Sequence, residues 1–92
     1  MSIIDDIIKF RDDRNWEQFH NTKDLALAIS IEAAELNELF LWTTHDMADQ
    51  DRIKEELADV LIYCFTLAHE CGFDIDQIIR EKMEKNKIKY PI

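Results

Sequence analysis

The sequence predicts an all-α fold, arranged as a single four-helix domain over residues 1–92. Three observations support this prediction. The chain has one glycine and one proline in 92 residues, whereas β-hairpins depend on such turn residues. Hydrophobic residues make up 47% of it, too many for a disordered tail, and they recur at helical spacing. Because a domain this small buries only about 60% of its unfolded surface, we also expect self-association.

The first helix is predicted from Ser2 to Arg14. Ser2 can cap it, and acidic residues in its first turn and basic residues near its end match the helix dipole. Its apolar stripe consists of Ile3, Ile4, Ile7, Ile8 and Phe10. The following segment, Asn15 to Asn21, is expected to be a loop. Its rings either plug a core or face a ligand, and they belong to Trp16, Phe19 and His20.

The second helix is predicted from Thr22, which can cap it, to about Trp42. Few of its residues are polar, so we expect it to be buried on most of its circumference. One chain can barely supply that much partner surface, which makes a monomer unexpected. A polar loop is predicted at Thr43 to Asp51.

The third helix is predicted from about Gln50 to Cys71, with Gly72 closing it as a C-terminal glycine. Asp74 or Asp76 can cap the fourth helix, which leads into the C-terminal sequence KNKIKYPI.

Charge excludes several classes of protein. The chain has 20 acidic and 11 basic residues, a net charge of −9, which disfavours nucleic-acid binding and anionic membrane surfaces.

No apolar run approaches the roughly 20 residues of a membrane span, and the acidic N-terminus is unlike a signal peptide. Cys64 and Cys71 on one helix would be separated by about 10.5 Å of rise, too far for a disulfide. We therefore expect reduced thiols and a cytoplasmic protein.

Two pairs of carboxylates stand in apolar helical sequence. Glu32 and Glu35, with Glu38 continuing the row, lie on the second helix, and Glu56 and Asp59 lie on the third. A spacing of three places the members of each pair on one face. Buried carboxylates need a compensating charge, and oxygen ligands without His or Cys suit Mg²⁺ or Mn²⁺. The pattern alone leaves a solvated acidic face as the alternative.

In combination these residues resemble the all-α nucleoside triphosphate pyrophosphohydrolases, and most of all the compact MazG-like branch that includes the dCTP pyrophosphatases. The similarity covers roughly residues 14 to 91. The segment between the two pairs is short and ends at Glu55-Glu56, where we take Glu56 as the ligand and expect Glu55 to face solvent. The residues that carry the resemblance are Trp16, Phe19-His20, Leu25 to Ala28, Glu32 to Glu35, Trp42, Asp59 to Tyr63, and Lys82 through Asn86 to Lys89-Tyr90-Pro91.

The resemblance implies an activity and an assembly. Such enzymes use Mg²⁺, with two or more ions per site, to cleave nucleoside triphosphates, often deoxynucleotides, to a monophosphate and pyrophosphate. They clear surplus or non-canonical nucleotides from the pool. They form homodimers or homotetramers in which the helices of neighbouring subunits complete a bundle.

Site residues are carried over in the same way. Glu32, Glu35, Glu56 and Asp59 would be the catalytic metal ligands, with Glu35 as a candidate for orienting the attacking water and Glu38 as an outer, water-mediated contact. Rings would hold the base and sugar; they are Trp16, Trp42 and Tyr63. His20 either bonds the base or ties down its loop. The phosphates would meet Lys82, Asn86, Lys89 and Tyr90, for which a solvated basic helix end is the alternative.

Two other functions compete with this interpretation. A non-catalytic acidic helical module that binds a basic partner would need neither Mg²⁺ nor the rings of Trp16 and Trp42, and it leaves an apolar-flanked Glu32 unexplained. A di-iron carboxylate bundle would need Glu-x-x-His motifs, and Asp59 stands where such a histidine would be required.

Overall fold

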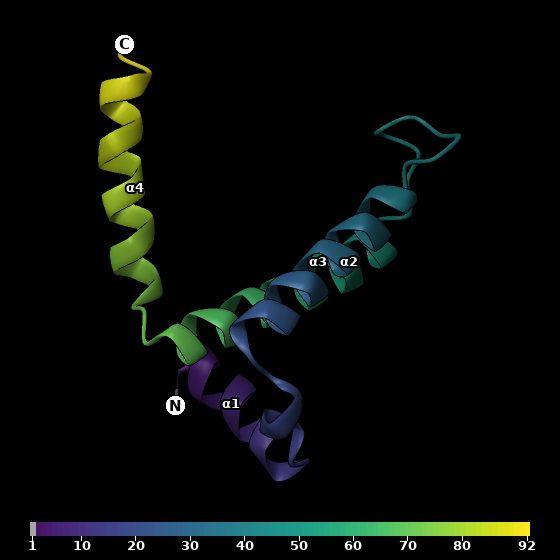
Figure 1. Cartoon of the computed structure of the whole chain (residues 1–92). Helices are drawn as coiled ribbons and strands as arrows, with labels where there is room; N and C mark the ends of the chain where they lie inside the picture. The colour runs from purple at the N-terminus through teal and green to yellow at the C-terminus, as the bar shows by residue number, and fades with distance from the viewer. Residues whose placement is uncertain (1) are drawn as a thin grey trace.

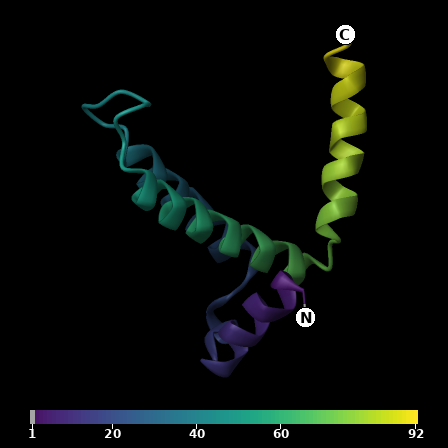
Figure 2. The ribbon, with the colours of Figure 1, turned by 180° about the vertical axis from the view of Figure 1, so that it is seen from behind.

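The computed structural model describes residues 2–92, and within that range the chain is helical and has no strand. Helices α2 and α3 pack side by side as a long hairpin, and α1 packs against α3 at the end of the hairpin opposite the α2–α3 loop (Figure 1). Helix α4 extends away from the other helices, as the view from behind also shows (Figure 2). The all-α prediction is confirmed. The elements are α1 (Ile3–Asp13), η1 (Trp16–Phe19, a 3₁₀-helix), α2 (Thr22–Glu38), α3 (Gln50–Cys71) and α4 (Ile75–Lys89).

Side-chain caps start the α-helices. The Ser2 hydroxyl accepts a hydrogen bond from the Asp5 amide at 3.3 Å, as predicted. Asn21 caps α2, one residue before the predicted Thr22, because its side-chain oxygen accepts from the Asp24 amide at 2.8 Å. Asp74, one of the two candidates, caps α4. Each cap satisfies an amide that has no partner within its helix.

The predicted end of the second helix is wrong by four residues. Helix α2 ends at Glu38 rather than Trp42, because its hydrogen bonds tighten from Leu39 onward to partners three residues back. Trp42 has a φ of 63°, a left-handed conformation that takes the chain out of the helical path. The predicted loop before α2 also needs correction, since it contains the single turn of η1, entered through Asn15 at a φ of 57°.

Helix α3 has the predicted bounds. Gly72 closes it at a φ of 71°, and its amide donates to the His69 carbonyl while the Phe73 amide donates to the Ala68 carbonyl. This pattern is a Schellman motif, in which glycine avoids the cost of a left-handed backbone. The turn redirects the chain, so α4 leaves the end of α3 without folding back along it (Figure 1).

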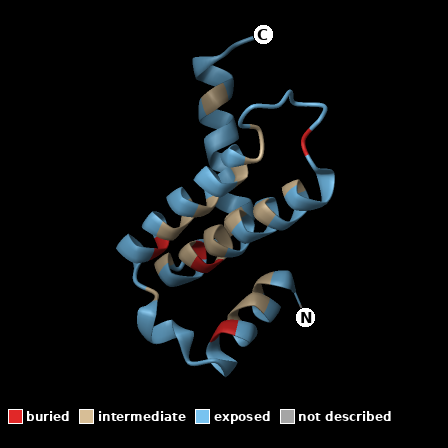
Figure 3. Ribbon diagram, turned by 90° about the vertical axis from the view of Figure 1, so that its right-hand side faces the viewer, coloured by how far each residue is buried: buried red, intermediate tan, exposed pale blue. Residues whose placement is uncertain are grey.

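The core of a single chain is small. Leu25 of α2 is the one large side chain below 2% exposure among the described residues, and the buried positions are few and scattered (Figure 3). Burial of α2 on most of its circumference is not achieved within one chain, because Leu27 and Ile31 remain 58% and 51% exposed. No helix in residues 2–92 has the length and apolar character needed to cross a membrane.

Candidate functional site

Three of the four predicted carboxylates meet between α2 and α3. Glu32 and Glu35 project from successive turns of α2, and Glu56 projects from α3. One carboxylate oxygen from each lies within 4.8 Å of the other two. These three side chains are called the carboxylate cluster below. The spacing of three on α2 brings its two glutamates to the face that packs against α3.

The carboxylate cluster contains hydrogen-bond acceptor atoms that have no partner in the described chain. Glu32 Oε2 and Glu56 Oε2 are buried, and neither has a hydrogen-bond partner among residues 2–92. None of the ion pairs in that range includes a member of the cluster. Buried carboxylate oxygens without partners are costly. A divalent cation fits this donor set, since oxygen ligands alone are what Mg²⁺ and Mn²⁺ prefer.

The crowding of negative charge perturbs two of these groups. Hydrogen bonding with Glu32 and the like charge of that neighbour raise the pKa of Glu35. Burial, followed by the charge of Glu35, raises the pKa of Glu56. Both shifts have the direction expected when carboxylates share a site without a compensating cation.

The other predicted acidic residues lie at the edge of the cluster. Asp59 is exposed, one turn beyond Glu56 on α3, and lies close enough that its charge contributes to the raised pKa of Glu56. Glu38 is exposed one turn beyond Glu35 and contributes in the same way to the pKa of Glu35. Glu55 is exposed, as predicted.

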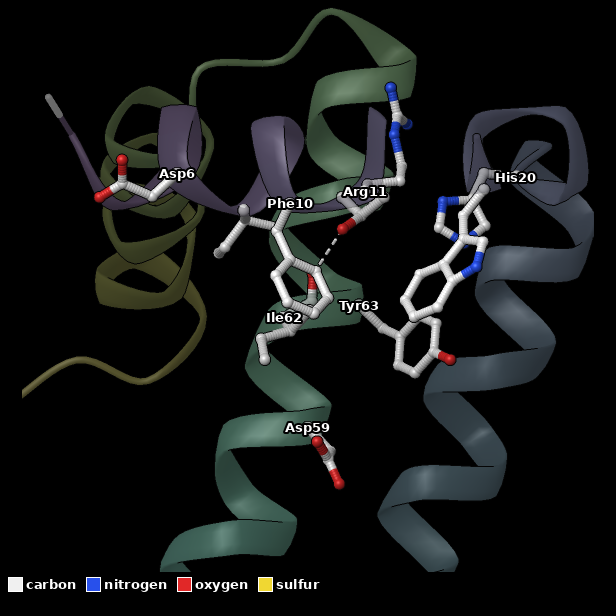
Figure 4. Close-up of a pocket in the computed structure, with 10 residues that line it drawn as sticks. Asp6, Phe10, Arg11, His20, Asp59, Ile62 and Tyr63 are labelled. Atoms are coloured by element: carbon white, nitrogen blue, oxygen red, sulfur yellow. Dashed lines mark hydrogen bonds between the residues drawn. The ribbon is translucent and has the colours of Figure 1, made fainter. Parts of the chain in front are cut away.

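A cavity of about 460 Å³ opens beside Asp59 (Figure 4). Helices α1 and α3 form two of its walls, and η1 with the residue after it forms a third. It brings together three of the predicted binding residues, Trp16, His20 and Tyr63. The remaining lining residues are Asp6, Ile7, Phe10, Arg11, Asp59, Ile62 and Thr66.

The rings of the cavity contact one another edge to face. Phe10 and Trp16 have ring centroids 5.8 Å apart at 71°, and the Arg14 guanidinium lies 3.5 Å from the Phe10 centroid. His20 and Tyr63 are 6.4 Å apart at 65°. Burial lowers the pKa of His20, so its imidazole is neutral near pH 7. Its Nδ1 is buried and has no partner in the described chain.

Several lining residues were not predicted from the sequence. Asp59, Ile62, Tyr63 and Thr66 stand at positions 0, 3, 4 and 7 of one helical face. That spacing could have extended the predicted set from Asp59 and Tyr63 to their neighbours. Arg11 had no comparable signal, because the residue that binds it is 59 positions away.

The structure does not bring the remaining predicted residues to the cavity or the cluster. Trp42 is fully exposed in the α2–α3 turn. The other four lie on or just after α4, which points away from both regions (Figure 2). They are Lys82, Asn86, Lys89 and Tyr90, of which Lys89 lies over the Tyr90 ring at 5.3 Å.

Fold and site together define an all-α protein with an interhelical carboxylate cluster beside a ring-lined cavity. The MazG-like family model matches residues 27–92. The chain therefore belongs to the MazG-like family, as its resemblance implied.

Named relatives agree with this membership. The chain is 38% identical to mouse dCTP pyrophosphatase 1 over 91% of its length, and 38% identical to the human protein over 90%. It spans about half of these relatives, 54% of each. A crystal structure of a pyrophosphatase from Archaeoglobus fulgidus matches with a TM-score of 0.85 and 39% identity, covering 98% of this chain and 90% of that one.

Proposed function

We propose that this chain is a Mg²⁺-dependent nucleoside triphosphate pyrophosphohydrolase that converts (d)NTPs to (d)NMPs and pyrophosphate. The carboxylate cluster carries this proposal, because two of its buried oxygens lack partners in the described chain and Asp59, one turn beyond Glu56, lines a cavity walled by aromatic rings. The names of the relatives, dCTP pyrophosphatase and pyrophosphatase, support the same reaction. They also favour deoxynucleotides and a role in clearing the nucleotide pool, which we expect to take place in the cytoplasm.

Glu32, Glu35 and Glu56 would hold the cation, with Asp59 adding a fourth carboxylate from α3. Mg²⁺ is the expected ion, Mn²⁺ the alternative, and four carboxylates suffice for two or more ions. When bound, the metal supplies charge neutralisation for the phosphates and lowers the pKa of a coordinated water. Without it, the acidic residues would repel a triphosphate.

The side chains themselves position the reactants. Glu35, the exposed member of the cluster, can accept a hydrogen bond from the attacking water, with Glu38 behind it as an outer contact. Trp16 and Tyr63 offer ring faces for the base and the sugar. Neutral His20 offers an unpartnered ring nitrogen to the base. Phosphoryl transfer depends mainly on such positioning and on neutralised charge.

A second copy of the chain completes the site in this proposal. Apolar side chains of the α2–α3 hairpin remain exposed, among them Leu27, Ile31, Leu57 and Leu61. Burying them against a neighbour would stabilise a homodimer or a homotetramer. The same assembly would bring Trp42 to the base, and the basic side of α4 to the phosphates, at a site of another subunit.

Product analysis tests the proposed reaction. The purified protein is incubated with a panel of dNTPs and NTPs, in Mg²⁺ and in EDTA, and the products are separated. Monophosphate with pyrophosphate, formed only with metal, is the expected result. Diphosphate with phosphate would contradict cleavage between the α- and β-phosphates. No turnover of any nucleotide would favour the acidic interaction module instead.

A further inference from the structure

One ion pair, buried on its arginine side, joins α1 to α3. The Arg11 side chain is 8% exposed, and its Nη1 donates to Glu70 Oε1 near the end of α3. Its Nε donates to Asp12 Oδ1 at 2.9 Å. Among residues 2–92 this is the one ion pair that joins two different helices, because the others link neighbours along the chain. Losing Glu70 leaves the buried guanidinium of Arg11 with one acidic contact instead of two, and losing Arg11 removes this link between the helices.

The Arg11–Glu70 pair joins the two helices whose side chains face each other across the cavity. Ile7, Phe10 and Arg11 line the cavity from α1, opposite Ile62 and Tyr63 of α3 (Figure 4). Phe10 in turn holds Trp16 edge to face at 5.8 Å. The distance between these walls therefore depends on how α1 is fixed to α3, which is what the Arg11–Glu70 contact does.

The carboxylate cluster does not share this dependence. Its three members come from α2 and α3, which pack along their lengths without α1. Glu70 lies fourteen residues beyond Glu56 on α3, about 21 Å of helical rise. If α1 moved relative to α3, the cavity would change shape while the carboxylate cluster stayed in place.

We propose that Arg11 and Glu70 are positioning residues for nucleotide binding, which set the width of the ring-lined cavity by fixing α1 to α3. This inference rests on the proposed function, in which that cavity receives the base. It predicts that breaking the pair weakens substrate binding without changing the chemical step or the demand for metal.

Steady-state kinetics test the proposal with Arg11→Met, Glu70→Gln and the double variant. Each single change should raise KM about 10-fold, with kcat and the half-saturating Mg²⁺ concentration within about 2-fold of wild type. The double variant should be no worse than either single one, since both remove one interaction. Arg11→Lys, which keeps the charge, should recover part of the loss. The matched control is Asp13→Asn, which breaks the exposed Lys9–Asp13 pair of the same helix.

Three kinetic outcomes would overturn the proposal. The first is an unchanged KM in both single variants. The second is a parallel loss of kcat, metal response and helicity, including in Arg11→Lys, which would mean that the pair supports the fold as a whole. The third is additive effects in the double variant, which would show that the two residues act separately.

A second readout does not need turnover. The chain has two tryptophans, so its ¹H–¹⁵N spectrum has two indole signals. Arg11→Met and Glu70→Gln should shift the Trp16 signal and leave that of Trp42 in place. If wild type hydrolyses no nucleotide, the proposed function fails while this shift still tests the positioning role. If wild type is active and neither KM nor the Trp16 signal responds, the positioning role fails alone.

Discussion

Glu32 on α2 and Glu56 on α3 place carboxylate oxygens within 4.8 Å of each other, and each residue keeps a buried oxygen without a partner in the described part of the chain. Two acidic groups from different helices have been brought together where repulsion opposes the packing. A cation between them would turn this repulsion into a link between the helices. The consequences can be measured on the metal site, the cavity and the assembly.

Removing one carboxylate from α2 should abolish hydrolysis while preserving the fold. We expect Glu32→Gln to lower kcat/KM by about 100-fold or more, the scale associated with loss of a metal site's support. Glutamine keeps the size and helix propensity of glutamate, so the circular dichroism spectrum should be unchanged. Retained activity in this variant would remove Glu32 from the catalytic site.

The metal-free protein should become less stable as the pH rises. The folded-state pKa values of Glu35 and Glu56 lie above the ordinary value of 4.5. Between the ordinary and the raised values the folded chain binds more protons than the unfolded chain, so stability falls with rising pH through this window. Above the folded-state pKa values both groups are ionised in the folded chain, so the lost free energy of unfolding is not regained. Glu35→Gln removes the repulsion and should therefore gain stability over wild type as pH rises.

Urea unfolding in EDTA across this pH range measures the difference. The unfolding midpoint of Glu35→Gln should separate from that of wild type as the pH rises, and the gap should then stay constant. Glu55→Gln, an exposed substitution on α3, is the control for loss of one negative charge. A constant difference at every pH would show that the carboxylates of the cluster do not affect one another.

The ring of Trp16 should contribute more to nucleotide binding than the ring of Phe19, which lies on the same 3₁₀-helix. Stacking of a base on an aromatic side chain contributes about 1–3 kcal/mol, so Trp16→Ala should raise KM about 10-fold or more. Phe19 is 65% exposed and does not line the cavity, so Phe19→Ala should leave KM near the wild-type value. Equal effects of the two substitutions would demote Trp16 to local packing.

If each site is shared between two subunits, two inactive variants should restore activity when they assemble together. Glu56→Gln and Lys82→Met are each expected to be inactive, because one removes a cluster carboxylate and the other the proposed phosphate contact. If Lys82 serves the site of a neighbouring subunit, a mixed dimer has one doubly altered site and one intact site. Co-expression of the two variants in equal amounts should recover about one quarter of wild-type activity. No recovery would place Lys82 and Glu56 in the same subunit's site, whereas an active Lys82→Met variant would place Lys82 outside any site.

The local chemistry of the chain explains which features could be predicted from its sequence. Ser2, Asp74 and Gly72 are capping residues whose effect depends on the next few positions, and the helix ends they specify agree with prediction. The C-terminal end of α2 had no such residue. The apolar run Leu39 to Trp42 continues the helical pattern in the sequence, but its hydrogen bonds tighten from Leu39 onward and the left-handed backbone at Trp42 takes the chain out of the helical path.

Contacts between distant segments could be predicted only where a helical spacing repeated on both sides. The paired spacing of three on α2 and α3 brings Glu32, Glu35 and Glu56 together and leaves the fourth predicted carboxylate, Asp59, at the edge of the cluster. The Arg11–Glu70 pair joins single residues far apart in the chain, so no periodicity indicated it. Trp42 and Lys82 lie away from the cavity within one chain, and sequence patterns do not contain the arrangement of a second copy.

Binding of Mg²⁺ to the carboxylate cluster is the most direct test of the central claim. Isothermal titration of the nucleotide-free protein should show Mg²⁺ binding in wild type and equal binding in Glu55→Gln. Glu56→Gln should weaken it by about 10-fold or more, because it removes one of the two buried oxygens that lack partners. Unchanged affinity in Glu56→Gln, or no binding to wild type, would contradict a metal site between α2 and α3.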